Sequence, residues 1–551
     1  MEEYSQGRFF HNVGKAVNVL MLVIFIPVLF CVMFIGNKMD YFDDVKADIL
    51  VPNALLTLIA LGAFGIGLWL LSLGRKIQWS RRMNRYMNLG LAVLFTGFFF
   101  FCLMLSKETV FDMSVDQGIV RRTAIDVAHG IPMGYRFEFS IDYNNLPITY
   151  ILAQLYRRGE GWSWFHHNPE YLWVITGCLS VTAAGFCCCE MVKKLTKNPA
   201  AVLLAFGLYL LTAGICPWKY IPYTDSYGIF FPVLCLLLYL YSRDCRNTFG
   251  KIILLAAAFL SGAAGGFIKP SAYIAVLAVL GVEGIALLDA LIGWMQNKRK
   301  MLEKSGAGIR FRNTCLSLFL SLFFAGTLYW GTDICQEHII QAMGLEYNEE
   351  LESTLQYYFF SSTNETTTGS FSIEDYGVFG EFQFSKEERN AACMERAWER
   401  IRQRGPVGTI YFCLKKLVKS FNDGTFAWTD VRYYEPFPEN LAHANRGAEF
   451  LRSLFMPGGA RQAWYDTFAE LVWIFLLAGI PGIVLGKRER ASYMVFAMLL
   501  IGILLYLMLF ESGARYLYIF LPVFTAMSVC GMESAGAALA GIRTKSIDRN
   551  K

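Results

Sequence analysis

Twelve long apolar runs constrain this chain more than any other feature. A run of about 18 or more apolar residues is long enough for an α-helix to cross a bilayer. We place spans near residues 17–36, 51–73, 87–105, 171–191, 199–217, 228–242, 252–268, 271–292, 314–332, 469–486, 492–510 and 516–537, of which the sixth is short. Hydrophobic residues make up 55% of the 551, which is more than soluble domains usually carry. We therefore predict an all-α polytopic membrane protein.

The basic residues gather on one set of connections between these spans. With the N-terminus in the cytoplasm, every even-numbered connection returns to the cytoplasm, where lysine and arginine are enriched. These connections and the C-terminal tail carry Arg75, Lys76, Arg81, Arg82, Arg85, Lys193, Lys194, Lys197, Arg243, Arg246, Lys251, Lys298, Arg299, Lys300, Lys304, Arg310, Arg312, Lys487, Arg488, Arg490, Arg543, Lys545, Arg549 and Lys551. We predict a plasma-membrane protein with both termini cytoplasmic, and the net charge of +5 then requires no nucleic-acid partner.

Two long connections face outward in this topology. The first covers residues 106–170, and the second covers residues 333–468, which we predict to be a small, mainly helical extracytoplasmic domain and call the helical insert. The sequence thus divides into five parts. They are the first three spans (1–105), the first outer loop (106–170), spans four to nine (171–332), the helical insert (333–468), and the last three spans with a basic tail (469–551).

The first outer loop contains the stretch SVDQGIVRRTAIDVAHG, residues 114–130. Its apolar spacing predicts a short helix over 115–129 that Gly130 and Pro132 end. Asp116 stands in the first turn, where it is either a stabiliser of the helix N-terminus or part of a site. The apolar stretch 148–156 is too short to span and is predicted to be an interfacial or re-entrant helix.

Two isolated charges occur in the shorter outer turns. Asp225, in IPYTDSYG, stands at the mouth of an apolar helix, where it is either a functional residue or a helix cap. Lys269, in GGFIKPSAY, is a cation that the topology does not require. It indicates either an anionic ligand or contact with lipid phosphate by snorkelling.

The helical insert has clear helix signals. Ser385 and Glu388 form a capping box, and Gly405 with Pro406 ends the helix that follows. Over residues 407–421 one face is apolar and several lysines, including Lys416, lie off it. This pattern predicts an amphipathic helix on the membrane surface, with lysines at the level of lipid phosphate.

The sequence gives little indication of a metal or a disulfide framework. Most of the fourteen cysteines lie inside apolar runs and form no CxxC pair. His166 and His167 are adjacent, so a regular helix or strand would not direct both at one ion. We predict no cofactor, and a divalent cation has no support.

The order and sidedness of these motifs resemble the GT-C class of integral-membrane glycosyltransferases. The chain looks like family 39-type members, such as protein O-mannosyltransferases and lipid A aminoarabinose transferases. In those families the first loop carries Asp-Glu, so the resemblance makes Asp116 the catalytic base and Gln117 the replacement of the glutamate. IPYTDSYG resembles the second-loop aspartate and gives Asp225. FIKPSA resembles the turn whose lysine contacts the donor phosphate and gives Lys269.

Two further motifs carry the resemblance. ESGARYLYIFLP is similar to a late Arg-Tyr before the last span and gives Arg515 and Tyr516. KKLVKSFNDGT looks like the Lys-then-Asp-Gly-Thr signature of Gram-positive bacterial members, which suggests Lys416 and Asp423. The resemblance implies a GT-C fold with about twelve spans, a polyprenyl-phosphate sugar donor, and inverting transfer to a glycan, lipid or protein acceptor on the outer face.

The residue types suit that chemistry. One carboxylate, Asp116, can take the proton of the acceptor hydroxyl, with Asp225 and Gln117 in support. Cations can stabilise the leaving phosphate as its charge develops. Lys269 and Arg515 are the candidates, together with Arg121 and Arg122 of the first loop.

Two alternatives remain open. A transporter or flippase of lipid-linked glycans would have a similar number of spans, although such proteins usually carry mid-span charges and internal repeats. The apolar runs here are nearly free of charge, and no half-to-half repeat is evident. A polymerase or ligase of lipid-linked glycans would present a similar outer face.

Overall fold

The computed structural model describes residues 8–36, 47–106, 115–245, 247–299, 307–429, 446–456, 458–486 and 490–549. Its regular structure in these ranges is helical, apart from an isolated bridge between Gly134 and Leu345. Several residues named above lie outside the described ranges, namely Ser114, Arg246, Lys300, Lys304, Lys487, Arg488 and Lys551.

Eleven helical stretches in the described ranges are long and apolar enough to cross a membrane, by length and composition. They are formed by α1 (Arg8–Phe34), α2 (Asn53–Gly74), α3 (Arg81–Ser106), α7 (Tyr171–Thr196), α9 (Thr224–Gly228) with α10 (Phe230–Asp244), α11 (Thr248–Ile268), α12 (Tyr273–Arg299), α13 (Ala307–Ala342), α19 (Gln462–Gly479) with η9 (Ile480–Leu485), α20 (Arg490–Leu509), and η10 (Ala514–Phe520) with α21 (Leu521–Arg549). The predicted fifth span corresponds to a shorter apolar helix, α8 (Pro199–Tyr209), continued by a π-helical turn, η3 (Leu210–Gly214). The prediction of an all-α polytopic membrane protein is confirmed.

The last span forms the centre of the bundle. In the most apolar part of the stretch Ala514–Gly541, 89% of the residues are buried, against 11% for the span within α13 at the periphery. α21 packs on η9, α7 and α19. Glycine allows the closest of these approaches, since a Cβ added to Gly531 would lie 2.1 Å from the carbonyl oxygen of Gly479. Small residues at such crossings are typical of helices packed in membranes.

The first outer loop folds into short helices, as predicted. α4 (Val115–Ala128) ends two residues before Gly130, whose φ of 77° suits glycine. α5 (Phe137–Ile141) and η2 (Tyr143–Asn145) follow, and then α6 (Leu146–Gly161), which begins with a proline in its first turn. α4 packs along α6.

The helical insert, residues 333–468, opens with the last turns of α13, which continues to Ala342. It contains η6 (Glu349–Leu351), α14 (Leu355–Ser361), α15 (Ile373–Tyr376), α16 (Val378–Glu381), α17 (Lys386–Phe421) and α18 (Arg446–Phe455). Ser385 caps α17 by accepting from the Glu388 amide at 3.2 Å. The backbone of Gly405 is not helical (φ 67°, ψ 175°) and breaks α17 where the sequence predicts a stop.

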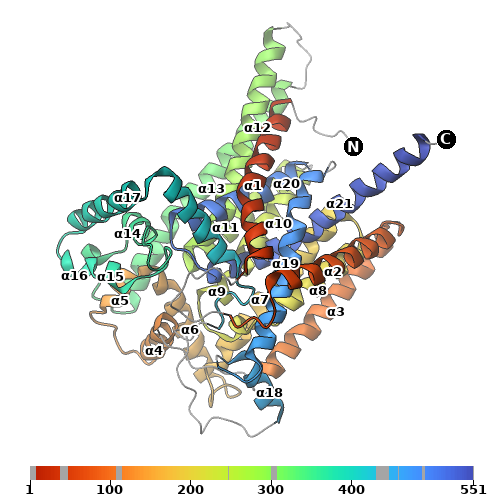
Figure 1. Ribbon diagram of the computed structural model, residues 1–551. Coiled ribbons are helices and arrows are strands. Elements are labelled where there is room, and N and C mark those ends of the chain that lie inside the picture. Colours follow the sequence, from red (N-terminus) through yellow and green to blue (C-terminus); the bar gives the residue numbers. More distant parts are fainter. Residues whose placement is uncertain are drawn as a thin grey trace.

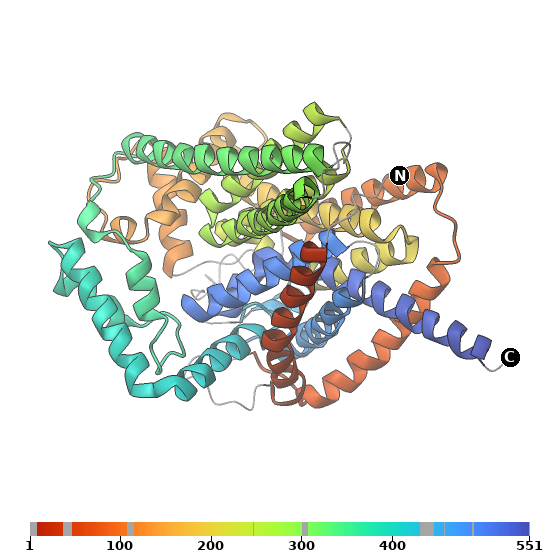
Figure 2. The same cartoon turned by 90° about the horizontal axis from the view of Figure 1, so that it is seen from above.

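The connections separate into two groups in space. Figure 1 shows α14 to α17 beside α5, and Figure 2 shows them at the end of the bundle opposite the C-terminal end of α21. Near that opposite end, Glu533 accepts from Arg75 at 2.9 Å and from Asn198 at 3.1 Å. Lys194 pairs with Asp244. Loops that the charge pattern assigns to one side therefore contact one another, while the assignment of that side to the cytoplasm stays a prediction.

Candidate active site

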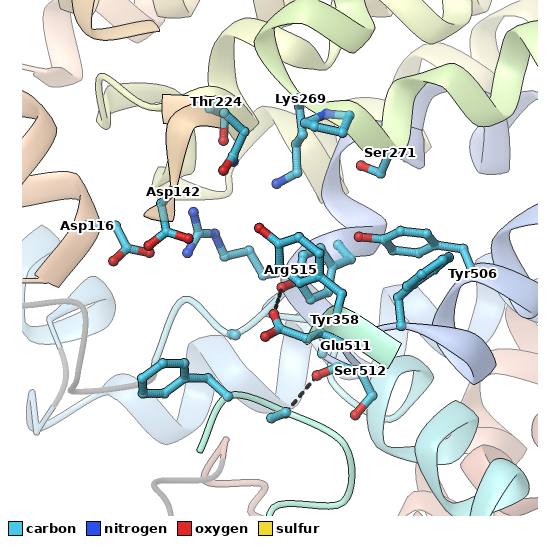
Figure 3. A pocket seen from close by; sticks show the side chains of 18 of the residues that line it. Asp116, Asp142, Thr224, Lys269, Ser271, Tyr358, Tyr506, Glu511, Ser512 and Arg515 are labelled. Carbon is cyan, nitrogen blue, oxygen red and sulfur yellow. Dashed lines mark hydrogen bonds between the residues drawn. The ribbon is translucent and has the colours of Figure 1, made fainter. Parts of the chain in front are cut away.

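A cavity of about 900 Å³ lies where the first outer loop, the helical insert and the turns between spans meet. Figure 3 shows its charged and aromatic side chains converging from these separate segments. Of the residues that the sequence singled out, five line the cavity: Asp116, Lys269, Asp423, Arg515 and Tyr516. A sixth, Asp225, lies directly behind two of them.

Asp225 holds two cations of the cavity wall. It is the second residue of α9 and is fully buried. One carboxylate oxygen pairs with Lys269, at the junction of α11 and η5 (Pro270–Ala272), and the other accepts from Arg515 Nε at 2.8 Å. Because one carboxylate serves two cations, this cluster of three side chains carries a net charge of about +1 at neutral pH. It combines three turns that are far apart in sequence.

Aromatic rings fix the direction of both cations. The Arg515 guanidinium lies 4.7 Å from the ring centroid of Tyr223 and 5.3 Å from that of Trp218. The Lys269 ammonium lies 5.6 Å from the ring centroid of Tyr516. Cation–π contacts of this kind add to the ion pair and limit the rotamers of long side chains. Both cations are therefore held at the cavity wall by an ion pair and by aromatic contacts.

Three carboxyl groups face these cations. Asp116 is in the first turn of α4, Asp142 follows α5, and Glu511 follows α20. Asp116 is an exposed residue of the cavity wall, but the protein around it limits the hydration of its carboxylate and so raises its pKa, and the positive charge of Arg515 partly opposes that rise. Figure 3 shows the Asp116 and Asp142 carboxyl groups next to each other. Asp116 is thus a carboxylate whose basicity exceeds that of an aspartate fully surrounded by water.

Asp142 and Glu511 have raised pKa values for the same physical reasons. Burial and then the charges of Asp116, Glu511 and Glu138 raise the pKa of Asp142 well above its ordinary value. Burial also raises the pKa of Glu511, although the hydroxyl of Tyr516 donates to its carboxylate at 2.5 Å and opposes the rise. A proton on Asp142 would relieve the repulsion among the three groups.

The sequence reasoning missed Asp142 and Glu511. Glu511 lies four residues before Arg515 in the same short turn, ESGAR, and that proximity was an available signal. Asp142 is a single carboxylate between two short helices, without a motif around it. Only the tertiary structure brings it to Asp116.

Three residues of the first loop do not line the cavity. Gln117 is a buried residue of α4, and neither Gln117 nor Arg122 is among the described residues that line the cavity. Arg121 makes two hydrogen bonds to Glu170, each 2.9 Å long, and so connects α4 to the start of α7. The structure does not bring these side chains to Lys269 and Arg515.

Lys416 is buried rather than at a membrane surface. Its ammonium donates to the carbonyl oxygens of Ser362 (3.0 Å), Met508 (2.9 Å) and Phe510 (2.7 Å). These bonds connect α17 to the end of α20 and to the turn that carries Glu511. Burial lowers the pKa of Lys416 to about 7. Lys416 is therefore placed to fix the cavity wall rather than to contact a ligand.

Asp423 organises a strained turn on the cavity wall. Its carboxylate accepts from the Thr425 amide at 2.8 Å and from the Ala427 amide at 2.7 Å. Phe426 and Ala427 have φ values of 58° and 57°, which side-chain-bearing residues rarely adopt. The hydrogen bonds to Asp423 stabilise this conformation. No group of three or more His, Cys, Asp or Glu side chains suited to a metal ion occurs in the part of the chain that the structure describes.

The helices and the cavity define a polytopic membrane protein with an ion-paired, carboxyl-lined site at one end of its spans. The chain belongs to the family described as "Conserved hypothetical integral membrane protein", whose model matches residues 9–535. No curated protein sequence matches it significantly. The chain is similar to the crystal structure of ArnT from Cupriavidus metallidurans bound to undecaprenyl phosphate, with 11% identity over 82% of this chain and 79% of that one and a TM-score of 0.28.

Proposed function

We propose that this protein is a GT-C-type membrane glycosyltransferase that moves a sugar from a polyprenyl-phosphate donor to an acceptor hydroxyl in the cavity. One observation carries the proposal: Asp116 and the pair of Lys269 and Arg515 line the same cavity. A base and phosphate-binding cations are the groups that such a transfer requires. The acceptor belongs to the classes of envelope glycan, lipid or protein.

At the anomeric carbon the reaction forms one bond and breaks one, and one proton moves from the acceptor to the protein. The acceptor oxygen bonds to the anomeric carbon as its proton passes to Asp116. The bond between the anomeric carbon and the phosphate oxygen breaks, and the electron pair leaves with the phosphate. Lys269 and Arg515 stabilise the growing negative charge. Attack on the face opposite the phosphate inverts the anomeric configuration.

The roles of the other polar residues follow from their contacts. Asp225 is a positioning residue, because it holds Lys269 and Arg515 without lining the cavity. Asp142 lies beside Asp116 and has the more strongly raised pKa, so a proton held by Asp142 would leave Asp116 as the anionic base and could be donated in a hydrogen bond to the acceptor. Tyr516 and Glu511 are joined by a hydrogen bond beside Lys269 and complete the wall.

The proposed orientation puts the cavity outside the plasma membrane and both termini in the cytoplasm. The charge pattern supports it, since the basic connections lie away from the cavity. The donor then presents its headgroup from the bilayer, and no nucleotide site is needed.

The proposal is tested by supplying the purified, reconstituted protein with radiolabelled polyprenyl-phosphate sugars and cell membranes. We expect label to move from the donor lipid into a new product. Failure of transfer from every donor, together with passage of the lipid-linked sugar across the vesicle membrane, would instead show a transporter or flippase.

A further inference from the structure

Ser271 lies on the cavity wall, and its hydroxyl group has no protein partner among the residues that the structure describes. Ser271 is 4% exposed and lines the cavity. Its Oγ has no hydrogen-bond partner within the described ranges. Buried polar atoms are nearly always paired, and an unpaired one costs about 1–3 kcal/mol. An unpaired hydroxyl that faces a cavity therefore points to a ligand atom.

The surroundings of Ser271 favour an anionic ligand. Ser271 follows Lys269 by two residues, in the turn η5 that leads into the 27-residue helix α12. Figure 3 shows the Lys269 ammonium and the Ser271 hydroxyl on the same wall of the cavity. The N-terminal end of a long helix carries partial positive charge and favours anions. The Lys269 ammonium, the Ser271 hydroxyl and the N-terminal end of α12 thus lie close together on one part of the cavity wall.

The turn does not use the Ser271 hydroxyl for its own stability. Pro270 begins η5, and the Ala272 amide donates to the Lys269 carbonyl at 2.9 Å. The Asn198 and Asn247 side chains, in contrast, cap the starts of α8 and α11. A purely structural serine at Ser271 would be expected to make a comparable bond.

We infer that the Ser271 hydroxyl donates a hydrogen bond to a non-bridging phosphate oxygen of the lipid-linked substrate, next to Lys269. The inference rests on the proposed function and adds a neutral donor to its phosphate site. Lys269 supplies charge, and Ser271 supplies direction, because a hydroxyl hydrogen bond is more sensitive to geometry than an ammonium contact. The polyprenyl phosphate that remains after the transfer accepts the same hydrogen bond from Ser271 as the sugar donor did.

The test compares two probes that differ in the phosphate alone. The full-length protein in nanodiscs is titrated with a polyprenyl phosphate and with the corresponding polyprenol, and binding is followed by native mass spectrometry. The wild type should prefer the phosphate. Ser271→Ala should bind polyprenyl phosphate roughly tenfold more weakly, since hydrogen bonds to charged groups have about that effect. Its affinity for polyprenol should be unchanged.

Two control variants separate the hydroxyl from packing. Ser271→Thr keeps a hydroxyl and should bind polyprenyl phosphate as the wild type does. Ser261→Ala removes a buried serine of α11 whose hydroxyl already donates to the Phe231 carbonyl at 3.1 Å and which does not line the cavity. It should leave the preference for phosphate unchanged.

The outcomes distinguish this inference from the proposed function. A wild type that binds polyprenol and polyprenyl phosphate equally would contradict the proposed function itself. A wild-type preference that Lys269→Ala abolishes and Ser271→Ala leaves intact would refute the role of Ser271 and keep the proposed function. An equal loss of affinity for polyprenyl phosphate in Ser271→Ala and Ser271→Thr would also refute the role of Ser271, because the threonine keeps the hydroxyl and should therefore keep the binding.

Discussion

The buried carboxylate of Asp225 gives the sharpest stability prediction. It neutralises one of two cations that are themselves mostly buried, with side-chain exposures of 8% for Lys269 and 13% for Arg515. Asp225→Asn raises the net charge of this cluster from about +1 to about +2. It also replaces one carboxylate oxygen, a hydrogen-bond acceptor, with an amide nitrogen, which is a donor. Breaking a buried ion pair from one side typically costs about 3–5 kcal/mol. We therefore expect Asp225→Asn to lower the free energy of unfolding of the protein by this amount.

The same charge count predicts how the partners behave. Lys269→Met leaves Arg515 paired with Asp225, and the cluster becomes neutral, so its stability loss should be well below that of Asp225→Asn. The double variant Asp225→Asn/Lys269→Met returns to about +1. We therefore expect it to be more stable than Asp225→Asn alone, although it lacks the phosphate-binding lysine and should stay inactive.

The assay is equilibrium unfolding in mixed detergent micelles, carried out on all four proteins as a double-mutant cycle. The expected coupling energy between positions 225 and 269 is about 1–3 kcal/mol in the direction of rescue. Additive losses, or an Asp225→Asn variant as stable as the wild type, would refute the account of Asp225 as the counter-charge of two buried cations.

Two further predictions concern the base and the buried lysine. Limited hydration of its carboxylate raises the pKa of Asp116, and the charge of Arg515 lowers it. The rate should therefore fall as the pH drops through a raised pKa, and Arg515→Gln should move that acid limb of the kcat/KM profile to higher pH. An acid limb that does not move would contradict the coupling. Lys416→Met should lower the free energy of unfolding by about 1–3 kcal/mol and should lower kcat, because three buried carbonyl oxygens lose their hydrogen-bond donor. Lys415→Met, on the same helix, is the matched control and should change neither quantity.

Much of the fold could be predicted from the sequence because the bilayer imposes a simple rule. Apolar runs of sufficient length and the side on which cations gather predict spans and sidedness directly. Local signals also sufficed where they were unambiguous, as for Gly130 at the end of α4 and Gly405 in α17. Each of these features is determined within a short stretch of the chain and requires no contact between distant residues.

The candidate site could be predicted only in part, because its residues meet through tertiary contacts. The amphipathic pattern of α17 placed Lys416 off the apolar face and gave no sign that a partner would bury it. Nothing near Asp142 signalled its approach to Asp116. For Arg121 and Arg122, in contrast, the helical periodicity itself indicates a direction away from Asp116. At about 100° per residue, the two side chains project roughly 140° and 120° away from Asp116, on either side of the helix.

The most direct test of the central claim is transfer by Asp116→Asn. Purified wild type and variant are reconstituted and supplied with the radiolabelled polyprenyl-phosphate sugar that the wild type uses, and label in the product is measured under single-turnover conditions. The matched control is Asp126→Asn, on the same helix, whose carboxylate contacts Arg136 at 3.7 Å instead of the cavity. We predict that Asp116→Asn lowers the rate about 10²–10⁴-fold, as expected for loss of a general base, while Asp126→Asn keeps wild-type activity and both variants insert normally. Full activity in a normally inserted Asp116→Asn variant would contradict the account.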